Sequence, residues 1–160
     1  MKRIAALLFG LALSVCGFGA LWTGANPLSA AIGAFTLVSY LCLYTPLKQR
    51  TWLSTTVGAI PGAMPPLIGY AAARGTLTAE AWVLAAILFL WQFPHFYAIA
   101  WMYREDYARA GLPMLPVTHG NDYTRLQILL YTLVLLAATL LPFAQGMSGW
   151  LYLAAALALG

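Results

Sequence analysis

The sequence predicts an all-α protein, a multi-pass transmembrane helical bundle, from three observations. Of its 160 residues, 62% are apolar and only 8% are charged, whereas soluble domains carry about 25% charged residues. The mean hydropathy is high, at +0.81. A helix crosses the bilayer core with about 20 apolar residues, and the charges are clustered so that four stretches of at least this length contain none. These stretches are residues 4–47, 51–73, 81–103 and 126–160.

The first uncharged stretch is too long for one helix, and a turn signal at residues 23–27, Thr-Gly-Ala-Asn-Pro, interrupts it. It therefore predicts two spans joined by a tight hairpin. The last segment makes about 16 Å of helix, roughly half of the bilayer core. We expect one transmembrane domain, residues 1–160, with five complete spans and a truncated sixth, and the truncation suggests part of a longer protein. The expected spans are about 4–22, 28–43, 53–73, 81–102, 126–144 and, in part, 150–160.

The third expected span is rich in helix-breaking residues. Six of them lie within 12 positions: Gly58, Pro61, Gly62, Pro65, Pro66 and Gly69. Each Pro inside a helix removes a backbone hydrogen bond, and in lipid such a segment is stable only where protein or a water-filled cavity satisfies the backbone. Two interpretations stay open, a kinked helix packed through small residues or a kinked wall of a ligand cavity.

The distribution of basic residues predicts the orientation. Only Arg74 falls on one side of the membrane. The other side carries Lys2, Arg3, Lys48, Arg50, Arg104, Arg109 and Arg125. By the positive-inside rule, this second side and the N-terminus are cytoplasmic, which predicts a protein of the cell inner membrane. No basic run with interleaved aromatic residues accompanies the net charge of +4, so we expect a lipid bilayer and no nucleic acid as partner.

The second cytoplasmic loop, residues 103–119, contains two adjacent carboxylates. If the preceding helix continues through this loop to residue 110, Asp106 and Arg109 share a face at i, i+3, and Glu105 and Arg109 share one at i, i+4. A basic membrane face with one or two carboxylates suits an anionic phosphate group held through Mg²⁺. The alternative is ordinary charge next to the membrane, solvated and paired in salt bridges.

Two histidines are further candidates. His95 lies about two turns before the cytoplasmic end of the fourth expected span, and an ionisable residue inside a span is a functional candidate by default. A hydrogen-bonded structural histidine is an equal alternative. His119 lies in the loop, where a solvated side chain is the simpler interpretation. The two histidines have no Cys or carboxylate partner at ligand spacing, so the zinc signal is weak.

Five segments occur in the same order in one family. They are Tyr44-Thr45-Pro46-Leu47-Lys48, residues 58–69, Pro94-His95-Phe96, Arg104-Glu105-Asp106-Tyr107 and residues 111–116, Gly-Leu-Pro-Met-Leu-Pro. On these motifs the chain closely resembles the haem O synthases (protohaem IX farnesyltransferases), within the UbiA-type intramembrane prenyltransferases. The resemblance covers essentially the whole chain. Members of that family have a nine-helix fold, and this chain is similar to the stretch from about the third helix into the eighth.

The resemblance implies a reaction and a set of residues. Family members transfer a farnesyl group from farnesyl diphosphate to a vinyl group of haem B, with addition of water, and release diphosphate. Two aspartate-rich loops hold the diphosphate through Mg²⁺; Asp106 matches the second loop, and Glu105 beside it is the other implied metal ligand. Lys48 matches a basic position, and His95 completes the implied catalytic set. The implied binding residues are Tyr44, Arg50, Arg104, Arg109 and His119.

Two further expectations follow from the resemblance. The allylic cation of this reaction needs a dry aromatic pocket, for which Trp91, Phe93, Phe96, Tyr97 and Trp101 are candidates. The first aspartate-rich loop would precede residue 4 and is absent from the chain, so we expect the 160 residues alone to be inactive. Gln49 and Ser54 stand where many relatives carry Arg and Asn, a difference expected to alter loop packing more than chemistry.

Two other functions stay open. One is a UbiA-type prenyltransferase that acts on a quinone precursor, although the Pro-His-Phe and Arg-Glu-Asp-Tyr motifs argue against it. The other is a small transporter or a structural membrane subunit without enzymatic activity. Transport would be favoured by paired broken segments in two halves of the chain, and only one strongly broken span is present. The sequence does not indicate an oligomeric state.

Overall fold

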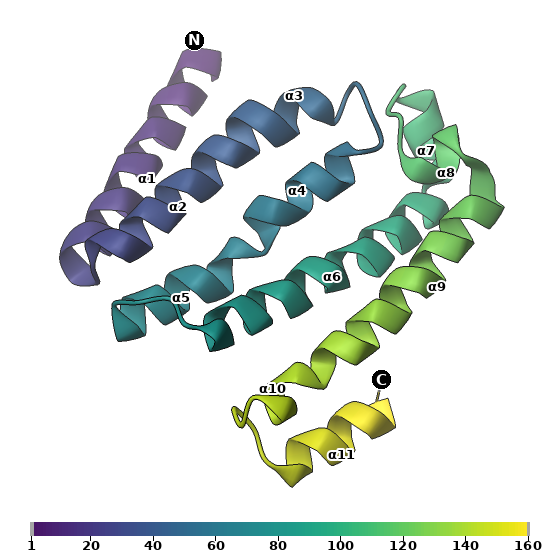
Figure 1. Cartoon of the computed structure of the whole chain (residues 1–160). Helices are drawn as coiled ribbons and strands as arrows, with labels where there is room; N and C mark the ends of the chain where they lie inside the picture. The colour runs from purple at the N-terminus through teal and green to yellow at the C-terminus, as the bar shows by residue number, and fades with distance from the viewer. Residues whose placement is uncertain (1, 160) are drawn as a thin grey trace.

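The computed structural model describes residues 2–159, and all of the regular structure within that range is helical. Consecutive long helices run antiparallel and lie side by side in a splayed row (Figure 1). Helix α6 packs against α4, α5 and α9, and α2 packs against α1 and α5. The long and medium helices are α1 (Lys2–Gly24), α2 (Pro27–Ser39), α4 (Ser54–Gly62), α5 (Met64–Arg74), α6 (Ala79–Met102), α9 (Gly120–Thr139) and α11 (Trp150–Leu159). The short ones are η1 (Tyr40–Tyr44), α3 (Thr45–Leu47), α7 (Arg104–Arg109), α8 (Leu115–Thr118) and α10 (Leu141–Ala144).

Four helical segments are long and apolar enough to cross a membrane. They are Arg3–Gly24, Pro27–Leu47, Ala79–Met102 and Gly120–Ala144. A multi-pass helical bundle is therefore confirmed. The fifth expected span begins earlier than residue 126, because the helix already starts at Gly120 with a polar first turn. The count of five complete spans stays a prediction, because the third expected span is not one continuous helix.

That third span consists of α4 and α5, which meet at Ala63 (φ −91°, ψ −2°). Gln92 of α6 is buried at this junction, where its Nε2 donates to the carbonyl of Ala59 at 3.1 Å. A Cβ atom on Gly62 would lie 2.0 Å from Oε1 of Gln92, so only glycine admits the amide there. Gln92 thus adds a hydrogen bond from a neighbouring helix to the broken segment, at a carbonyl that also accepts from the N–H of Ala63 at 3.0 Å. Protein contacts of this kind are expected around an irregular segment inside a membrane. At the kink itself, the structure supports the packing interpretation.

The core between α6 and α9 is aromatic. The ring of Phe93 stacks on that of Tyr131, with centroids 4.1 Å apart and an interplanar angle of 8°. Tyr97 and Leu115 are buried in the same cluster. Phe93 is 1% exposed and Tyr97 is 2% exposed, and both side chains fill the space between helices. The expectation that these two residues line a substrate pocket is therefore wrong.

Candidate active site

The two loops that the sequence singled out lie at the same end of the bundle. The connection between α3 and α4 and the segment containing α7 and α8 both lie there, whereas the α1–α2 and α5–α6 turns lie at the other end (Figure 1). This arrangement follows from the antiparallel order of the long helices. Every predicted site residue except His95 and Tyr44 belongs to one of these two loops. The fold therefore gathers most of the predicted polar residues at one membrane face.

Helix α6 ends at Met102, and α7 is a separate short helix rather than its continuation. Tyr103, between them, has φ −104° and ψ 27°, outside the helical range. The condition considered from the sequence, one helix continuing to residue 110, is therefore not met. Asp106 and Arg109 nevertheless form an ion pair at i, i+3, with side chains 62% and 76% exposed. Such an exposed pair contributes little to stability, so the Asp106 carboxylate is available for a ligand.

A polar cavity of about 340 Å³ opens at the end of α6, and we call it the carboxylate cavity. Arg104 on its wall donates to Oδ1 of Asn121 at 3.2 Å. The guanidinium of Arg125 lies 5.6 Å from the ring of Trp101, another wall residue. Cations and carboxylates thus share one small space. The lining residues are Trp101, Met102, Tyr103, Arg104, Glu105, Asp106, Arg109 and Asn121.

The donor set of this cavity fits Mg²⁺ only together with an anionic ligand. Within residues 2–159, no group of three or more His, Cys, Asp or Glu side chains is arranged to hold a metal ion. Glu105 and Asp106 supply two neighbouring carboxylates. Proteins commonly bind Mg²⁺ through one or two carboxylates, with substrate phosphates and water completing the shell. The chemistry of the cavity therefore suits a metal-bridged phosphate.

A second cavity, of about 440 Å³, lies between η1, α4, α6 and the segment after α7, and we call it the lysine cavity. The Nζ of Lys48 lies 6.0 Å from the ring centroid of Tyr44. That ring packs closely on α4, because a Cβ atom on Gly58 would lie 2.6 Å from Cδ2 of Tyr44. The lining residues are Tyr40, Tyr44, Lys48, Ser54, Thr55, Gly58, Phe96, Tyr107, Leu112 and Met114.

Helix α7 contributes to both cavities, with Tyr107 lining the lysine cavity and Asp106 and Arg109 lining the carboxylate cavity. The resemblance placed Lys48 and Asp106 in one site, and here they line adjacent spaces. Sequence reasoning also missed that Ser54 and Thr55 face a cavity. Their signal is weak, because two hydroxyl residues at the start of a helix usually indicate only a cap.

The remaining predicted site residues line neither cavity. The imidazole of His95 is exposed on α6 and stacks on Trp91, with ring centroids 4.5 Å apart and an interplanar angle of 16°. His119 contacts the edge of the Trp52 ring at 5.0 Å between centroids, and its Nδ1 lies 2.8 Å from the hydroxyl oxygen of Thr118. Arg50 is exposed in the α3–α4 connection.

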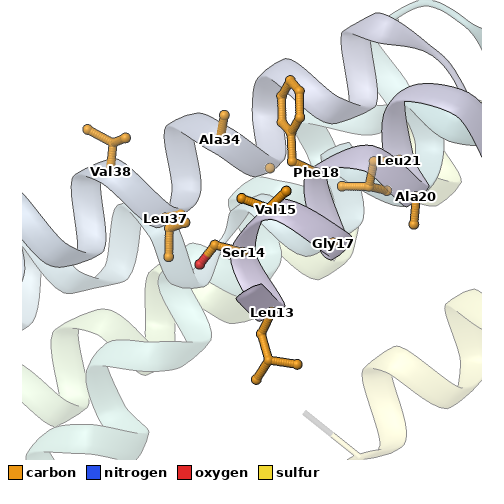
Figure 2. A pocket seen from close by; sticks show the side chains of 11 residues that line it. Leu13, Ser14, Val15, Gly17, Phe18, Ala20, Leu21, Ala34, Leu37 and Val38 are labelled. Carbon is orange, nitrogen blue, oxygen red and sulfur yellow. The ribbon is translucent and has the colours of Figure 1, made fainter. Parts of the chain in front are cut away.

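A larger cavity, of about 800 Å³, lies between α1 and α2, and no charged residue that the structure describes lines it. Figure 2 shows its walls, on which Leu13, Leu37 and other apolar side chains surround the space. The hydroxyl of Ser14 already donates to the carbonyl of Gly10 at 2.8 Å. This cavity offers no free charged group, so its size alone does not make it an active site.

Comparison with known proteins decides the family. Residues 1–160 match the UbiA prenyltransferase family over their whole length. The chain belongs to the UbiA prenyltransferase family. The resemblance inferred from the motifs is thereby confirmed, and the two cavities lie in a UbiA-type helical bundle.

Several curated UbiA relatives share a name. The chain is 67% identical over 156 residues to the "Protoheme IX farnesyltransferase" of Solibacter usitatus (strain Ellin6076). The aligned residues make up 97% of this chain and 53% of that protein. Proteins with the same name from Methylibium petroleiphilum and Leptothrix cholodnii are 57% and 56% identical over 161 residues, covering 100% of this chain. The chain spans about half the length of the curated relatives it matches. No solved structure matches it.

Proposed function

We propose that this chain forms part of the active site of a protohaem IX farnesyltransferase, which transfers a farnesyl group from farnesyl diphosphate to a vinyl group of haem B. The observation that carries the proposal is the carboxylate cavity, where Glu105 and Asp106 lie beside Arg104 and Arg109 at the end of an apolar bundle. The names of the relatives support the choice of substrates.

The proposed reaction joins two apolar partners by removing an anion. The allylic C–O bond breaks, and diphosphate leaves with the electron pair. The π electrons of the vinyl group form the new C–C bond to the allylic carbon. Water then adds to the resulting cation and loses a proton, so that the products are haem O, diphosphate and a proton. The barrier falls where cations stabilise the departing charge.

The chain provides such cations on the walls of both cavities. Arg104 and Arg109 would bind the departing diphosphate in the carboxylate cavity, and Lys48 would act from the neighbouring one. Glu105 and Asp106 would hold Mg²⁺, which supplies further neutralisation of the diphosphate charge. Arg50 lies in the exposed α3–α4 connection and would attract the anion from a distance.

Apolar and aromatic side chains next to these cavities would exclude water from the allylic cation. Phe96 lines the lysine cavity, and Trp101 lines the carboxylate cavity. Rings of this kind stabilise a neighbouring cation. His95, stacked on Trp91 in the membrane-spanning helix α6, would contact haem or accept the proton, and Tyr44 and His119 would shape the binding surface. Seven of the eight basic residues are expected on the side of the membrane where the cavities lie. By the positive-inside rule we propose an inner-membrane protein whose cavities face the cytoplasm.

A hybrid enzyme tests the proposal without relying on the 160 residues alone. Residues 1–160 replace the matching half of the Solibacter usitatus relative, and the hybrid is expressed in membranes with haem B, farnesyl diphosphate and Mg²⁺. We expect haem O, identified by its mass. Prenylation of an aromatic quinone precursor with no haem O would establish the alternative enzyme, and no transfer to either acceptor by a well-inserted hybrid would refute the proposed function.

A further inference from the structure

Two hydroxyl groups in the lysine cavity have no part in the proposed mechanism. They belong to Ser54 and Thr55, the first two residues of α4. Both residues line the cavity although they are only 2% and 8% exposed. A buried hydroxyl group costs free energy unless it is hydrogen-bonded, so each of these two groups is expected to have a hydrogen-bond partner.

Several hydroxyl groups elsewhere in the bundle are satisfied by their own helix. Thr36 and Thr132 each donate to the carbonyl four residues earlier, at 2.7 Å. This bond requires a preceding turn of the same helix. Ser54 and Thr55 begin their helix, so the carbonyls four residues earlier lie outside it, and the residue before them, Leu53, provides no side-chain cap. Their side chains lie at the wall of the cavity, within reach of whatever occupies it.

The charge of the cavity indicates what that occupant is. Lys48 lies on its wall half-buried, and no acidic residue lines the cavity. Within residues 2–159, the one ion pair joins Arg109 to Asp106, so Lys48 has no carboxylate partner there. A cation and two hydroxyl donors in one cavity favour an anion. Among the residues of this chain that line the cavity there is no carboxylate, the usual protein ligand of Mg²⁺, so the anion would contact the ammonium and hydroxyl groups directly.

We propose that Lys48, Ser54 and Thr55 form a metal-independent oxyanion subsite, in which the ammonium and the two hydroxyl groups donate to one phosphate or carboxylate group of a substrate. The inference rests on the proposed function, because that function supplies the two sources of the oxyanion, the diphosphate of the prenyl donor and a propionate carboxylate of haem. The apolar remainder of the substrate would lie against Phe96 and the tyrosine rings of the cavity. The subsite differs from the carboxylate cavity, where binding would depend on the metal.

Binding measured without metal tests this subsite directly. The hybrid of residues 1–160 with the remaining half of the Solibacter usitatus relative is placed in lipid nanodiscs with EDTA, and its affinities for inorganic pyrophosphate and for metal-free protoporphyrin IX, a dicarboxylate, are measured. Thr55→Val removes the hydroxyl and preserves the shape, whereas Thr55→Ser preserves the hydroxyl. Ser54→Ala is a second variant that removes only an oxygen atom. Thr132→Val is the matched control, because that hydroxyl bonds within α9.

Hydrogen bonds to charged groups are strong enough that each lost hydroxyl weakens binding of one probe by about tenfold. We expect this loss in Thr55→Val and Ser54→Ala, and wild-type affinity in Thr55→Ser and Thr132→Val. A loss for pyrophosphate assigns the subsite to the prenyl diphosphate, and a loss for protoporphyrin IX assigns it to a propionate.

Wild-type affinity for both probes in Thr55→Val and Ser54→Ala would overturn the subsite, as would an unsubstituted hybrid that binds neither probe in EDTA. Pyrophosphate binding that then appears with Mg²⁺ and disappears in Asp106→Asn would show that the proposed function survives. If pyrophosphate does not bind with Mg²⁺ either, the result would count against both the subsite and the proposed function.

Discussion

At the end of the bundle formed by the α1–α2 and α5–α6 turns, polar side chains tie neighbouring helices and turns together, whereas at the opposite end polar side chains also line two cavities. Asn26 accepts from the backbone N–H of Ser29 at 2.9 Å and donates to the carbonyl of Ala71 at 2.6 Å, which ties α2 to α5. Nearby, the hydroxyl of Tyr70 bonds to the carboxylate of Glu80. The polar groups of this end serve the fold.

At the end with the two cavities, the polar groups are arranged differently. Lys48 faces a cavity without a carboxylate, and Glu105 and Asp106 line a cavity together with two arginines. Polar groups that bind one another are expected to stabilise the fold, and groups left facing a cavity are expected to bind a ligand. Substitutions at the end with the α1–α2 and α5–α6 turns should therefore lower stability, and substitutions at the end with the two cavities should lower activity.

The largest effect is expected for Asp106→Asn in the hybrid enzyme. Loss of the charge should lower turnover by on the order of 100-fold, because the departing diphosphate loses metal-borne stabilisation. Insertion and thermal stability should not change, since Asp106 is exposed and paired only with Arg109. Asp122→Asn is the control, because Asp122 is exposed at the start of α9 and lines neither cavity. Near wild-type turnover in Asp106→Asn would remove this residue from the site.

Lys48→Met is expected to raise the KM for farnesyl diphosphate by about tenfold, the effect of losing one charge-assisted hydrogen bond. Steady-state kinetics of the hybrid, with each substrate varied in turn, separate the two substrates. Gln49→Met, at the exposed neighbouring position, should leave both KM values unchanged. A change confined to haem would place Lys48 at a propionate and not at the diphosphate.

The span that joins the two ends offers a stability test. Gly62→Ala should destabilise the chain by about 1–3 kcal/mol, because the new methyl group overlaps the buried amide of Gln92. Adding Gln92→Ala should recover part of this loss. Gly69→Ala is the matched control, since its Cβ would meet nothing within 4 Å. The free energy of unfolding by denaturant is measured in detergent micelles for the wild type, the two glycine variants and the double variant. Equal stabilities of Gly62→Ala and Gly69→Ala would show that the contact between Gly62 and Gln92 does not need glycine.

The sequence predicted a multi-pass helical bundle because hydropathy reports directly on contact with lipid, whereas the number of spans stays a prediction. It predicted a kink in the third span from its prolines and glycines, but it did not predict the break at Tyr103 or the packing of Gln92 at Ala63, because Gln92 is distant in sequence. The sequence placed Phe93 in a pocket because the sequence of one helix does not distinguish an aromatic residue that lines a pocket from one that packs against another helix. Here the partner is Tyr131.

The residues of the candidate site stay predictions, and the sequence did not predict how they are divided between two cavities. The motifs group Lys48 with Asp106 because relatives share both, and a motif gives no information on which wall a side chain occupies. Tyr107, next to Asp106 in the same motif, lines the other cavity because α7 turns the two side chains in different directions. That division depends on the break at Tyr103, which composition and periodicity do not encode.

A smaller loss of stability than at Gly62 is expected for Asn26, at the end where polar groups serve the fold. Its Oδ1 caps α2, and its Nδ2 donates to the carbonyl of Ala71 on α5. Asn26→Ala removes both contacts and should cost about 1–2 kcal/mol of unfolding free energy. Thr23→Ala, nearby on α1, removes an exposed hydrogen bond to Gly19 within one helix and should change stability by less than about 0.5 kcal/mol.

Asn26→Asp separates the two contacts, because a carboxylate still caps α2 but cannot donate to α5. If the link between helices matters, this variant should lose stability despite its favourable charge at a helix N-terminus. Metal-free pyrophosphate and protoporphyrin affinities should stay at the wild-type value in both Asn26 variants, since the residue is at the far end from the cavities. A wild-type stability for Asn26→Asp would assign the whole effect to the cap, and a loss of ligand affinity would show that the two ends are not independent.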